Sequence, residues 1–464
     1  MDDIKREEPV FAENKMGVLP IKKLIITMSL PMMISMLVQA LYNVVDSMFV
    51  AKISEEALTG VTLAFPLQML MISLGSGIGV GINALLSRSL GEKNFKNSDA
   101  AANTGLFLTA INILVFLFVG LFVAEPFIKG QVKSDDAAAA AEIAKSGSKY
   151  LKICTTLSFG IFFQMTFERL LQSTGKTILS MISQGTGAII NIIMDPILIF
   201  GLLGFPKLGV AGAAYATVLG QVMAAMLGMI MNLRYNKEIN FSVKDIIKPS
   251  VHAIKVIYTV GIPSVFMMSI GSVMTFLMNQ ILITFSTTAA TVFGIYFKLQ
   301  SFFFMPVFGM NNGLIPVLAY NYGARKKERI TEALSFAMKL AVSIMLVGVA
   351  VFELIPGLLL ACFDASEHML DIGIPALRII CLSFPIAGAC IAMGSVFQAF
   401  SKSSYSLVIS FGRQLVVLIP AAWLLSKTGH VVNVWWAFPI AEAVSLVLSL
   451  YFFKRIHRKI IDTL

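Results

Sequence analysis

The chain has 464 residues, of which 57% are hydrophobic and 13% are charged, and its formal net charge is +10. Because soluble domains carry about a quarter charged residues, this composition excludes a soluble protein of this size. Apolar stretches of about 18 or more residues recur along the chain, and each is long enough to cross the roughly 30 Å hydrocarbon core of a bilayer. These stretches lack the alternation typical of strands, so we expect α-helices to span the membrane.

Polar and glycine-containing breaks divide the apolar sequence into twelve predicted membrane-spanning helices. The predicted spans are residues 24–50, 58–87, 100–123, 148–171, 178–203, 209–232, 251–285, 289–318, 331–360, 371–399, 406–426 and 431–453. Lysine and arginine concentrate in every second break and at both ends of the chain, and the positive-inside rule places those segments in the cytoplasm. Both termini are then cytoplasmic, which requires an even number of spans. We attribute the positive charge to this topology and expect no nucleic-acid partner.

The two halves of the chain repeat. Residues 31–91 align with residues 263–323 at a constant offset of 232, and a second stretch pairs Gln172 with Gln398 at an offset of 226. Each half has six spans, so the repeats run parallel and form two bundles around a central cavity, an architecture typical of transporters. The predicted units are an N-terminal cytoplasmic tail (1–20), an N-lobe (21–233), a cytoplasmic linker (234–250), a C-lobe (251–453) and a C-terminal cytoplasmic tail (454–464).

Carboxylates inside the predicted spans are the first candidates for a functional site, because a charge in hydrocarbon costs several kcal/mol. Asp46 lies in the first span, and Gln39 and Asn43 precede it by seven and three residues on the same helical face. The fifth span holds Asn191 and Asp195, four residues apart. A rise of 1.5 Å per residue places both aspartates about 25–33 Å from the cytoplasmic ends of their helices, in the outer half of the membrane.

Two carboxylates at similar depth in one lobe can share a proton or bind Na⁺, and we expect such binding to rearrange the helices. The repeat places other residues at the equivalent positions of the C-lobe: Met278 for Asp46, Val417 for Asn191 and Ala421 for Asp195. Ion coupling is therefore expected in the N-lobe. The alternative, that each aspartate only caps or hydrogen-bonds a neighbouring helix, stays open.

The other polar residues within the spans are weaker candidates. Glu168, which precedes Arg169, is either a further carboxyl near the aspartates or half of an interfacial ion pair. In the C-lobe, Arg413 is expected to pair structurally or to snorkel. Three C-lobe residues are candidates for lining the cavity: Lys298, Gln300 and Met278.

Two prolines, Pro31 and Pro263, are expected to bend the first and seventh spans. The 35 phenylalanines and 26 methionines suit a pliable apolar cavity for organic cations.

No cofactor is expected from the sequence. The four cysteines have no CxxC spacing, the four histidines do not pair at ligand spacing, and no P-loop motif for ATP occurs. These absences argue against a resident metal, a disulfide and direct use of ATP. They also argue against a membrane enzyme, which would need such residues at helix ends.

Two motifs resemble the multidrug and toxic compound extrusion (MATE) family. SLPMMISMLVQ followed by YNVVDSMFVAKIS (29–54) is similar to the first helix of these transporters. LLQSTGKTILSMISQGTGAIINIIMDPILIF followed later by GVAGAAYAT (170–217) is similar to their fourth to sixth helices. The resemblance runs from about residue 20 to the C-terminus and is strongest to the bacterial branch of MepA-like exporters.

The resemblance implies a twelve-helix, two-lobed fold that exports cationic amphiphilic compounds in exchange for H⁺ or Na⁺. It implies a multi-pass protein of the cell inner (plasma) membrane, and we expect a monomer. The residues matching the family's polar network in the N-lobe are Gln39, Asp46, Tyr150, Asn191, Asp195 and Thr217.

The sequence departs from the family pattern at three places. Glu168 stands where many relatives have asparagine, and Gly271 stands where one branch has a glutamate. That branch also has an acidic residue in the tenth span, whereas none lies between Pro375 and Ser401. The last two departures agree with ion coupling in the N-lobe.

Two other membrane functions are alternatives for a chain of this composition. A flippase of lipid-linked or polysaccharide precursors with a similar two-bundle plan is the alternative function. A flippase of anionic headgroups should have several lysines or arginines along one cavity, whereas this chain has few and its N-lobe is acidic. A channel would need a repeated filter-like segment, and none is visible.

Overall fold

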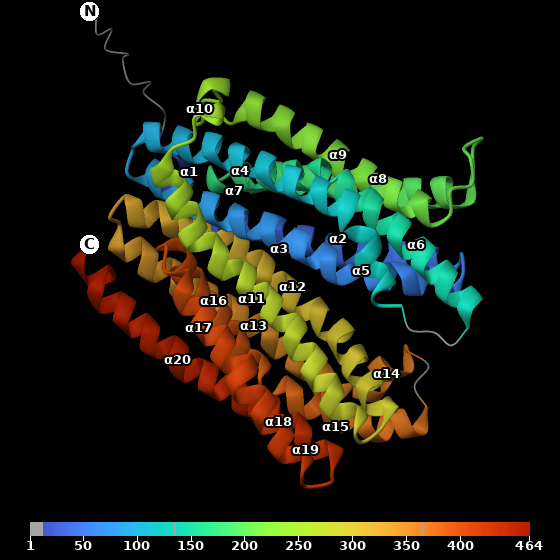
Figure 1. The fold of residues 1–464 in the computed structure, drawn as a ribbon. Helices are drawn as coiled ribbons and strands as arrows, with labels where there is room; N and C mark the ends of the chain where they lie inside the picture. The colour runs from blue at the N-terminus through green and yellow to red at the C-terminus, as the bar shows by residue number, and fades with distance from the viewer. Residues whose placement is uncertain (1–12, 133–135, 364–365) are drawn as a thin grey trace, which may run out of the picture.

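The computed structural model describes residues 13–132, 136–363 and 366–464, and it contains no β-strand within them. The long helices form two bundles that lie side by side in Figure 1. The N-lobe consists of α2 (Ile21–Ala51), α3 (Glu55–Gly91), α4 (Phe95–Phe122), α5 (Ala124–Lys129), α6 (Ala137–Thr156), α7 (Phe159–Ser173), α8 (Thr177–Phe200) and α9 (Val210–Tyr235). A short α1 (Lys15–Val18) precedes it, and α10 (Val243–Ile247) lies in the connection to the second bundle.

The C-lobe begins at α11. It consists of α11 (Val251–Ile283), α12 (Thr287–Gly323), α13 (Lys327–Leu354), α14 (Pro356–Ala361), α15 (Glu367–Cys381), α16 (Phe384–Ala399), α17 (Ser403–Phe411), a π-helix (Gly412–Leu418), α18 (Ile419–Ser426), α19 (Val431–Trp435), α20 (Ala437–Lys459) and a final 3₁₀ turn (Ile461–Thr463). Together the lobes confirm the predicted all-helical, two-bundle fold.

All twelve predicted spans coincide with helices, but the spans at 148–171 and 371–399 are each divided near their middle between two helices. Ten helical segments of the described chain are long and apolar enough to cross a membrane, and the bent pair α15–α16, with 46° between its halves, is an eleventh. The equivalent pair in the first half, α6–α7, is less apolar because α6 carries three lysines. These pairs replace the continuous spans predicted at 148–171 and 371–399.

Both breaks occur at the same short sequence. LSFG (157–160) separates α6 from α7, and LSFP (382–385) separates α15 from α16. Pro385 lies in the first turn of α16, where its missing N–H costs no hydrogen bond but prevents continuation from the preceding helix. Helices α2 and α11 run without interruption through Pro31 and Pro263, so these prolines do not break their helices, and the bends expected there stay predictions.

The repeat is visible in how helices begin. The Ser54 hydroxyl accepts a hydrogen bond from the backbone N–H of Ala57 at the start of α3, at 3.0 Å. Ser286, 232 residues later, does the same for Ala289 at the start of α12, also at 3.0 Å. Such caps satisfy a backbone donor that the helix leaves without a partner. The two central helices therefore start at equivalent positions.

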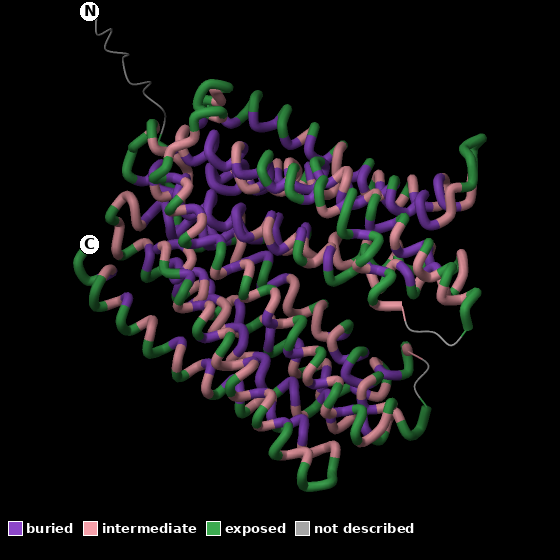
Figure 2. The backbone as a smooth tube through the Cα atoms, in the orientation of Figure 1, coloured by how far each residue is buried: buried purple, intermediate pink, exposed green. Residues whose placement is uncertain are grey.

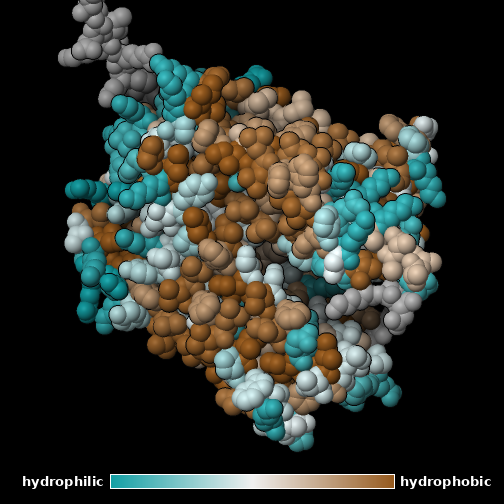
Figure 3. Space-filling model, in the orientation of Figure 1, coloured by the Kyte–Doolittle hydropathy of each residue, from teal (hydrophilic) through white to brown (hydrophobic). Residues whose placement is uncertain are grey.

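Helices α3 and α12 lie at the centre of the molecule. In their most apolar segments, 72% of α3 and 61% of α12 is buried, compared with 28% in α4, α11 and α13. Figure 2 shows this buried material between the outer helices, whose exposed positions face outward. Figure 3 shows that the exposed middle of both lobes is largely hydrophobic and that polar residues gather toward the ends. This distribution fits a bilayer around the bundles.

The two lobes meet near the chain ends. Helix α1, near the start of the described chain, and the C-terminus lie at the same end of the molecule (Figure 1), which we call the terminal end, and the opposite end is the far end. At the terminal end, a Cβ on Gly91 would clash with the carbonyl oxygen of Tyr320, and a Cβ on Gly323 would clash with that of Arg88. These two contacts are equivalent at the offset of 232. Glycine is needed here because the backbones of the two lobes approach directly.

A short N-terminal segment joins the lobes at the same end. Residues 13–19, called here the N-terminal bridge, include α1. Asn14 Nδ2 donates to the Thr174 carbonyl and to Glu238 Oε1 of the N-lobe side. The C-lobe contacts are Arg329 Nη2 to the carbonyls of Met16 (3.1 Å) and Leu19 (2.8 Å), Asn321 Nδ2 to the carbonyl of Met16 (3.1 Å), and Lys326 Nζ to Glu13 Oε1 (2.8 Å). The terminal end is closed, whereas the surface between the lobes is hollowed toward the far end (Figure 3).

Candidate functional site

Two carboxyl groups face each other inside the N-lobe. Asp46 is near the far end of α2, and Asp195 is in the last turns of α8. Their side chains interact directly, and Asp195 is fully buried. Both oxygens of Asp195 and Oδ1 of Asp46 are buried without a hydrogen-bond partner among the described residues. The predicted pairing of these aspartates is therefore present in the geometry, and we call them the acidic pair.

Tyr42 lies beside the acidic pair, one helical turn before Asp46 on α2. Its phenol interacts electrostatically with Asp46, Asp195 and Glu168. Glu168, on α7, is 8% exposed and accepts a hydrogen bond from Gln164 Nε2 at 2.9 Å. Tyr42 is therefore the residue that both the acidic pair and this third carboxyl reach. Sequence reasoning missed Tyr42, although its spacing of four residues from Asp46 places both on one helical face.

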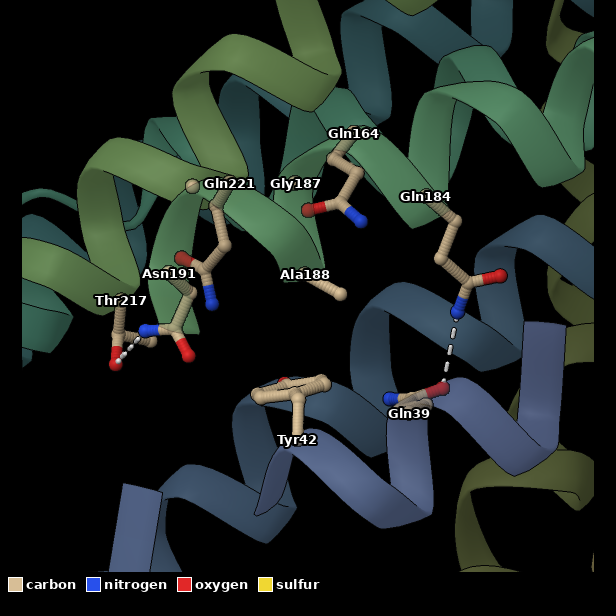
Figure 4. Close-up of a pocket in the computed structure, with 10 residues that line it drawn as sticks. Gln39, Tyr42, Gln164, Gln184, Gly187, Ala188, Asn191, Thr217 and Gln221 are labelled. Atoms are coloured by element: carbon tan, nitrogen blue, oxygen red, sulfur yellow. Dashed lines mark hydrogen bonds between the residues drawn. The ribbon is translucent and has the colours of Figure 1, made fainter. Parts of the chain in front are cut away.

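A polar cavity adjoins these carboxyls. It encloses about 340 Å³, open space included, between α2, α7, α8 and α9. Its walls carry Gln39, Tyr42, Gln164, Gln184, Gly187, Ala188, Asn191, Thr217, Gly220 and Gln221. Figure 4 shows the amide groups converging above the Tyr42 ring. We call this cavity the amide pocket.

Some predicted members of the polar network line the amide pocket. Gln39 Oε1 accepts from Gln184 Nε2 at 3.0 Å, and Asn191 Nδ2 donates to Thr217 Oγ1 at 3.3 Å. These contacts join α2 to α8 and α8 to α9 (Figure 4). Three glutamines that sequence reasoning missed complete the walls: Gln164, Gln184 and Gln221.

Two further network predictions have different outcomes. Tyr150 is buried, interacts with Asp46, and its hydroxyl accepts from Gln68 Nε2 at 3.5 Å. Asn43 is exposed, and its side chain makes no hydrogen bond within the described chain. The polar stripe predicted on α2 therefore continues through Tyr42 rather than through Asn43, because a spacing of four residues aligns better with the helical turn than a spacing of three.

The C-lobe candidates do not form a comparable cluster. Met278 is fully buried in the hydrophobic core, so it does not line an open cavity. Lys298 is exposed, with Nζ 6.0 Å from the centre of the Phe363 ring, and Gln300 is half-buried. At the positions equivalent to the acidic pair, the C-lobe has Met278 and Ala421, as the repeat predicted.

The C-lobe instead contains a buried ion pair. Arg413 Nη1 lies 2.6 Å from Glu442 Oε1, and the two side chains are 28% and 11% exposed. Arg413 lies in the π-helix between α17 and α18, which widens the helix locally. This confirms structural pairing rather than snorkelling for Arg413.

Arg169 connects the N-lobe to the C-lobe. Its Nη1 donates to Gln172 Oε1 at 3.0 Å and, across the interface, to Asn312 Oδ1 of α12 at 3.1 Å. Because Arg169 follows Glu168 directly, the buried carboxyl of Glu168 and a contact between the lobes lie on one short stretch of α7. Within the described residues, no group of three histidine, cysteine, aspartate or glutamate side chains has the arrangement of a metal site.

Comparison with known proteins agrees with this architecture. The family model MatE matches residues 31–197 and 263–424, one stretch in each lobe. The chain belongs to the MATE family of transporters. Because the two matched stretches are the two halves of the repeat, the family assignment covers both lobes.

The similar proteins extend over nearly the whole chain. The multidrug export protein MepA of Staphylococcus haemolyticus (strain JCSC1435) is 28% identical over 432 residues, which are 91% of each chain. MepA of Staphylococcus aureus (strain MRSA252) is 25% identical over 449 residues, 96% of each chain.

Solved structures of MATE transporters share the fold. An outward-facing multidrug resistance MATE transporter of the MOP superfamily aligns with a TM-score of 0.90 at 25% identity, covering 98% of this chain and 100% of that one. MATE in complex with MaL6 aligns with a TM-score of 0.89 at 25% identity and the same coverage. The prediction of a twelve-helix, two-lobed membrane transporter is confirmed.

Proposed function

We propose that this MATE transporter exports cationic amphiphilic compounds from the cytoplasm in exchange for H⁺ or Na⁺. The acidic pair is the observation that carries this proposal. Two carboxylates that face each other without a donor repel one another, and a bound H⁺ or Na⁺ relieves that repulsion. The names of the similar MepA proteins support export of more than one drug.

The site and the interface between the lobes share one helix, α2. Asp46 lies in the far half of α2, whereas Met28 in its terminal half contacts Gly313 of α12 in the C-lobe. An ion that joins Asp46 to Asp195 of α8 changes how α2 packs in the N-lobe. The same helix then changes its contact with α12, which is how ion binding biases the two lobes toward one arrangement.

The transport direction follows from the predicted topology. With both termini in the cytoplasm, the closed terminal end faces inward and the hollow at the far end faces outward. In this state the acidic pair takes an ion from outside and cargo leaves the N-lobe. The ion is released in the opposite arrangement, and new cargo then enters from the cytoplasm. A positively charged cargo is favoured because the interior of the N-lobe holds three carboxyl groups, those of Asp46, Asp195 and Glu168.

The experiment is efflux of ethidium from liposomes that contain the purified protein. A proton gradient and a Na⁺ gradient are imposed separately on the wild type, Asp46→Asn and Asp195→Asn. Asp371→Asn is the matched control, because Asp371 is an exposed carboxylate of the C-lobe.

We expect efflux with one of the gradients in the wild type and the control, and its loss in both N-lobe variants. The gradient that drives efflux identifies the coupling ion. Full efflux by either N-lobe variant would exclude the acidic pair as the coupling site. Absence of efflux in the wild type under both gradients would contradict export of this cation.

A further inference from the structure

Helix α6 carries a row of three lysines on one side. Lys145, Lys149 and Lys152 are spaced by four and three residues, which places them on one face of the helix, and all three are exposed. We call them the lysine row. The opposite face packs into the N-lobe, where a Cβ on Gly147 would clash with the carbonyl oxygen of Gly60 in α3. The lysine row therefore points away from the interior of the lobe.

The fold does not require lysine at these positions. The sequence LSF at both helix breaks aligns α6 with α15 at an offset of 225. At that offset the lysine row corresponds to Leu370, Ile374 and Leu377 of the C-lobe, which are all apolar. The same helix of the fold thus forms with apolar residues in one lobe and with lysines in the other, so the charges serve something other than folding.

Two lysines of the row lack an acidic partner. Lys149 and Lys152 form no ion pair with any residue that the structure describes, whereas Lys145 Nζ lies 3.6 Å from Glu142 Oε2. Glu125 of α5 interacts electrostatically with Lys152, but this carboxylate is already ion-paired at 2.6 Å with the lysine that ends α5. The protein therefore leaves most of the charge of Lys149 and Lys152 without a counter-charge of its own.

The unpaired lysines lie at the level expected for lipid headgroups. In the neighbouring helix α4, a Cβ on Gly120 would clash with Thr156 of α6, and α4 ends two residues later at Phe122. At a rise of 1.5 Å per residue, Lys152 lies about 6 Å and Lys149 about 10 Å beyond Thr156 toward the far end. The headgroup layer extends about 5–8 Å beyond the hydrocarbon core. Both flexible side chains can therefore place their ammonium groups in this layer.

The helix beside the lysine row offers a surface for acyl chains. Near its far end, α4 exposes the large apolar side chains of Leu114, Phe118 and Phe122, and the two phenylalanine rings lie 4.8 Å apart. Figure 3 shows hydrophilic residues at the place of α6 next to a hydrophobic surface. Positive charge at headgroup level next to exposed apolar helix surface matches the two parts of a phospholipid.

We propose that Lys149 and Lys152 bind the phosphate of an anionic phospholipid in the leaflet at the far end, with its acyl chains against α4. A headgroup such as phosphatidylglycerol has a phosphate and no positive group, so it supplies the counter-charge that the protein lacks. In a zwitterionic lipid, the choline competes with the lysines for the same phosphate. Each lysine near an anionic lipid surface strengthens association about fivefold.

The test is photolabelling of the full-length protein in phosphatidylcholine liposomes that contain a trace of a photoreactive lipid. Two probes are compared, phosphatidylglycerol and phosphatidylcholine, each with a diazirine near the carbonyl end of one acyl chain. The variants are Lys149→Gln and Lys152→Gln. Lys145→Gln is the matched control, because it removes one charge from the same face of α6 at a residue that is already paired and about 16 Å beyond Thr156.

Labelled peptides of α4 are quantified by mass spectrometry. Peptides from the end of α20 serve as the internal reference, because its basic residues Lys454 and Arg455 lie toward the opposite, terminal end of the molecule. Unchanged labelling of α20 shows that a variant is folded and inserted.

We expect the phosphatidylglycerol probe to label α4 of the wild type more strongly than the phosphatidylcholine probe. Lys149→Gln and Lys152→Gln should each lower labelling by phosphatidylglycerol about fivefold and leave labelling by phosphatidylcholine unchanged, whereas Lys145→Gln should lower it less than about twofold. Equal labelling of the wild type by both probes would overturn the proposal, since the lysine row would then be only a hydrated face. Undiminished labelling in the two variants, or an equal loss in Lys145→Gln, would overturn it as well.

Discussion

The buried pair of Arg413 and Glu442 provides a sharp test of the C-lobe. Removing one partner of a buried ion pair costs about 3–5 kcal/mol, whereas replacing both by apolar residues is often neutral. Both side chains are less than a third exposed, so that range applies with little reduction for solvent. The guanidinium stays protonated when its partner is lost, whereas a carboxylate can take up a proton. Glu442→Leu should therefore destabilise the C-lobe more than Arg413→Met, and the double variant should recover most of the loss.

Unfolding of the C-lobe can be followed by tryptophan fluorescence in detergent, because all three tryptophans (Trp423, Trp435 and Trp436) lie in that lobe. Lys327→Met is the control, since the pair of Lys327 and Asp462 is 42% and 44% exposed and such pairs contribute about 0–1 kcal/mol. The reasoning would be refuted by a double variant that is as unstable as Glu442→Leu. It would also be refuted by single variants that lose no more stability than Lys327→Met does.

Three other predictions concern the terminal end. Gly91→Ala should loosen the contact between the lobes and speed hydrogen exchange at the terminal ends of α3 and α12, whereas Gly294→Ala, with no atom within 4 Å of its Cβ, should not. Arg329→Gln should speed exchange in the N-terminal bridge about 10- to 100-fold, since it removes charge-assisted hydrogen bonds worth about 1.5–3 kcal/mol. Lys326 holds the pKa of Glu13 below its ordinary value, so this contact is complete at neutral pH and is lost only when the pH falls through that lowered pKa, in acid. Glu13→Gln should therefore leave the pH profile of transport between pH 5 and 8 unchanged, and a shifted profile would contradict this.

The spans were predictable because the hydropathy of a span is averaged over about 20 residues. A local irregularity affects only a few of these residues and changes the average little. The breaks in the fourth and tenth spans were not predictable in the same way, since LSFG and LSFP are themselves largely apolar. A break at such a sequence changes the direction of the helix but leaves the mean hydropathy of the span almost unchanged. Only the recurrence of the same three letters in both halves signals it.

The acidic pair was predictable because a charge inside a span is rare and costly. Tyr42 was missed because an aromatic residue in an apolar helix does not stand out from its neighbours. Gln164, Gln184 and Gln221 were missed for another reason, since each is a single polar residue on a different helix. Their convergence on one cavity depends on how α7, α8 and α9 pack, which no periodicity in the sequence encodes.

The reciprocal glycine contacts at the terminal end bear on how the two duplicated halves could diverge. Gly91 and Gly323 contact main-chain atoms of the other half, so this part of the interface between the lobes depends on few side chains. If a lobe keeps this glycine, the polar residues in its interior can be substituted without changing its contact with the other lobe. One half of an ancestral pair can thus retain carboxylates while the other replaces the same positions with methionine and alanine, and both still close against each other.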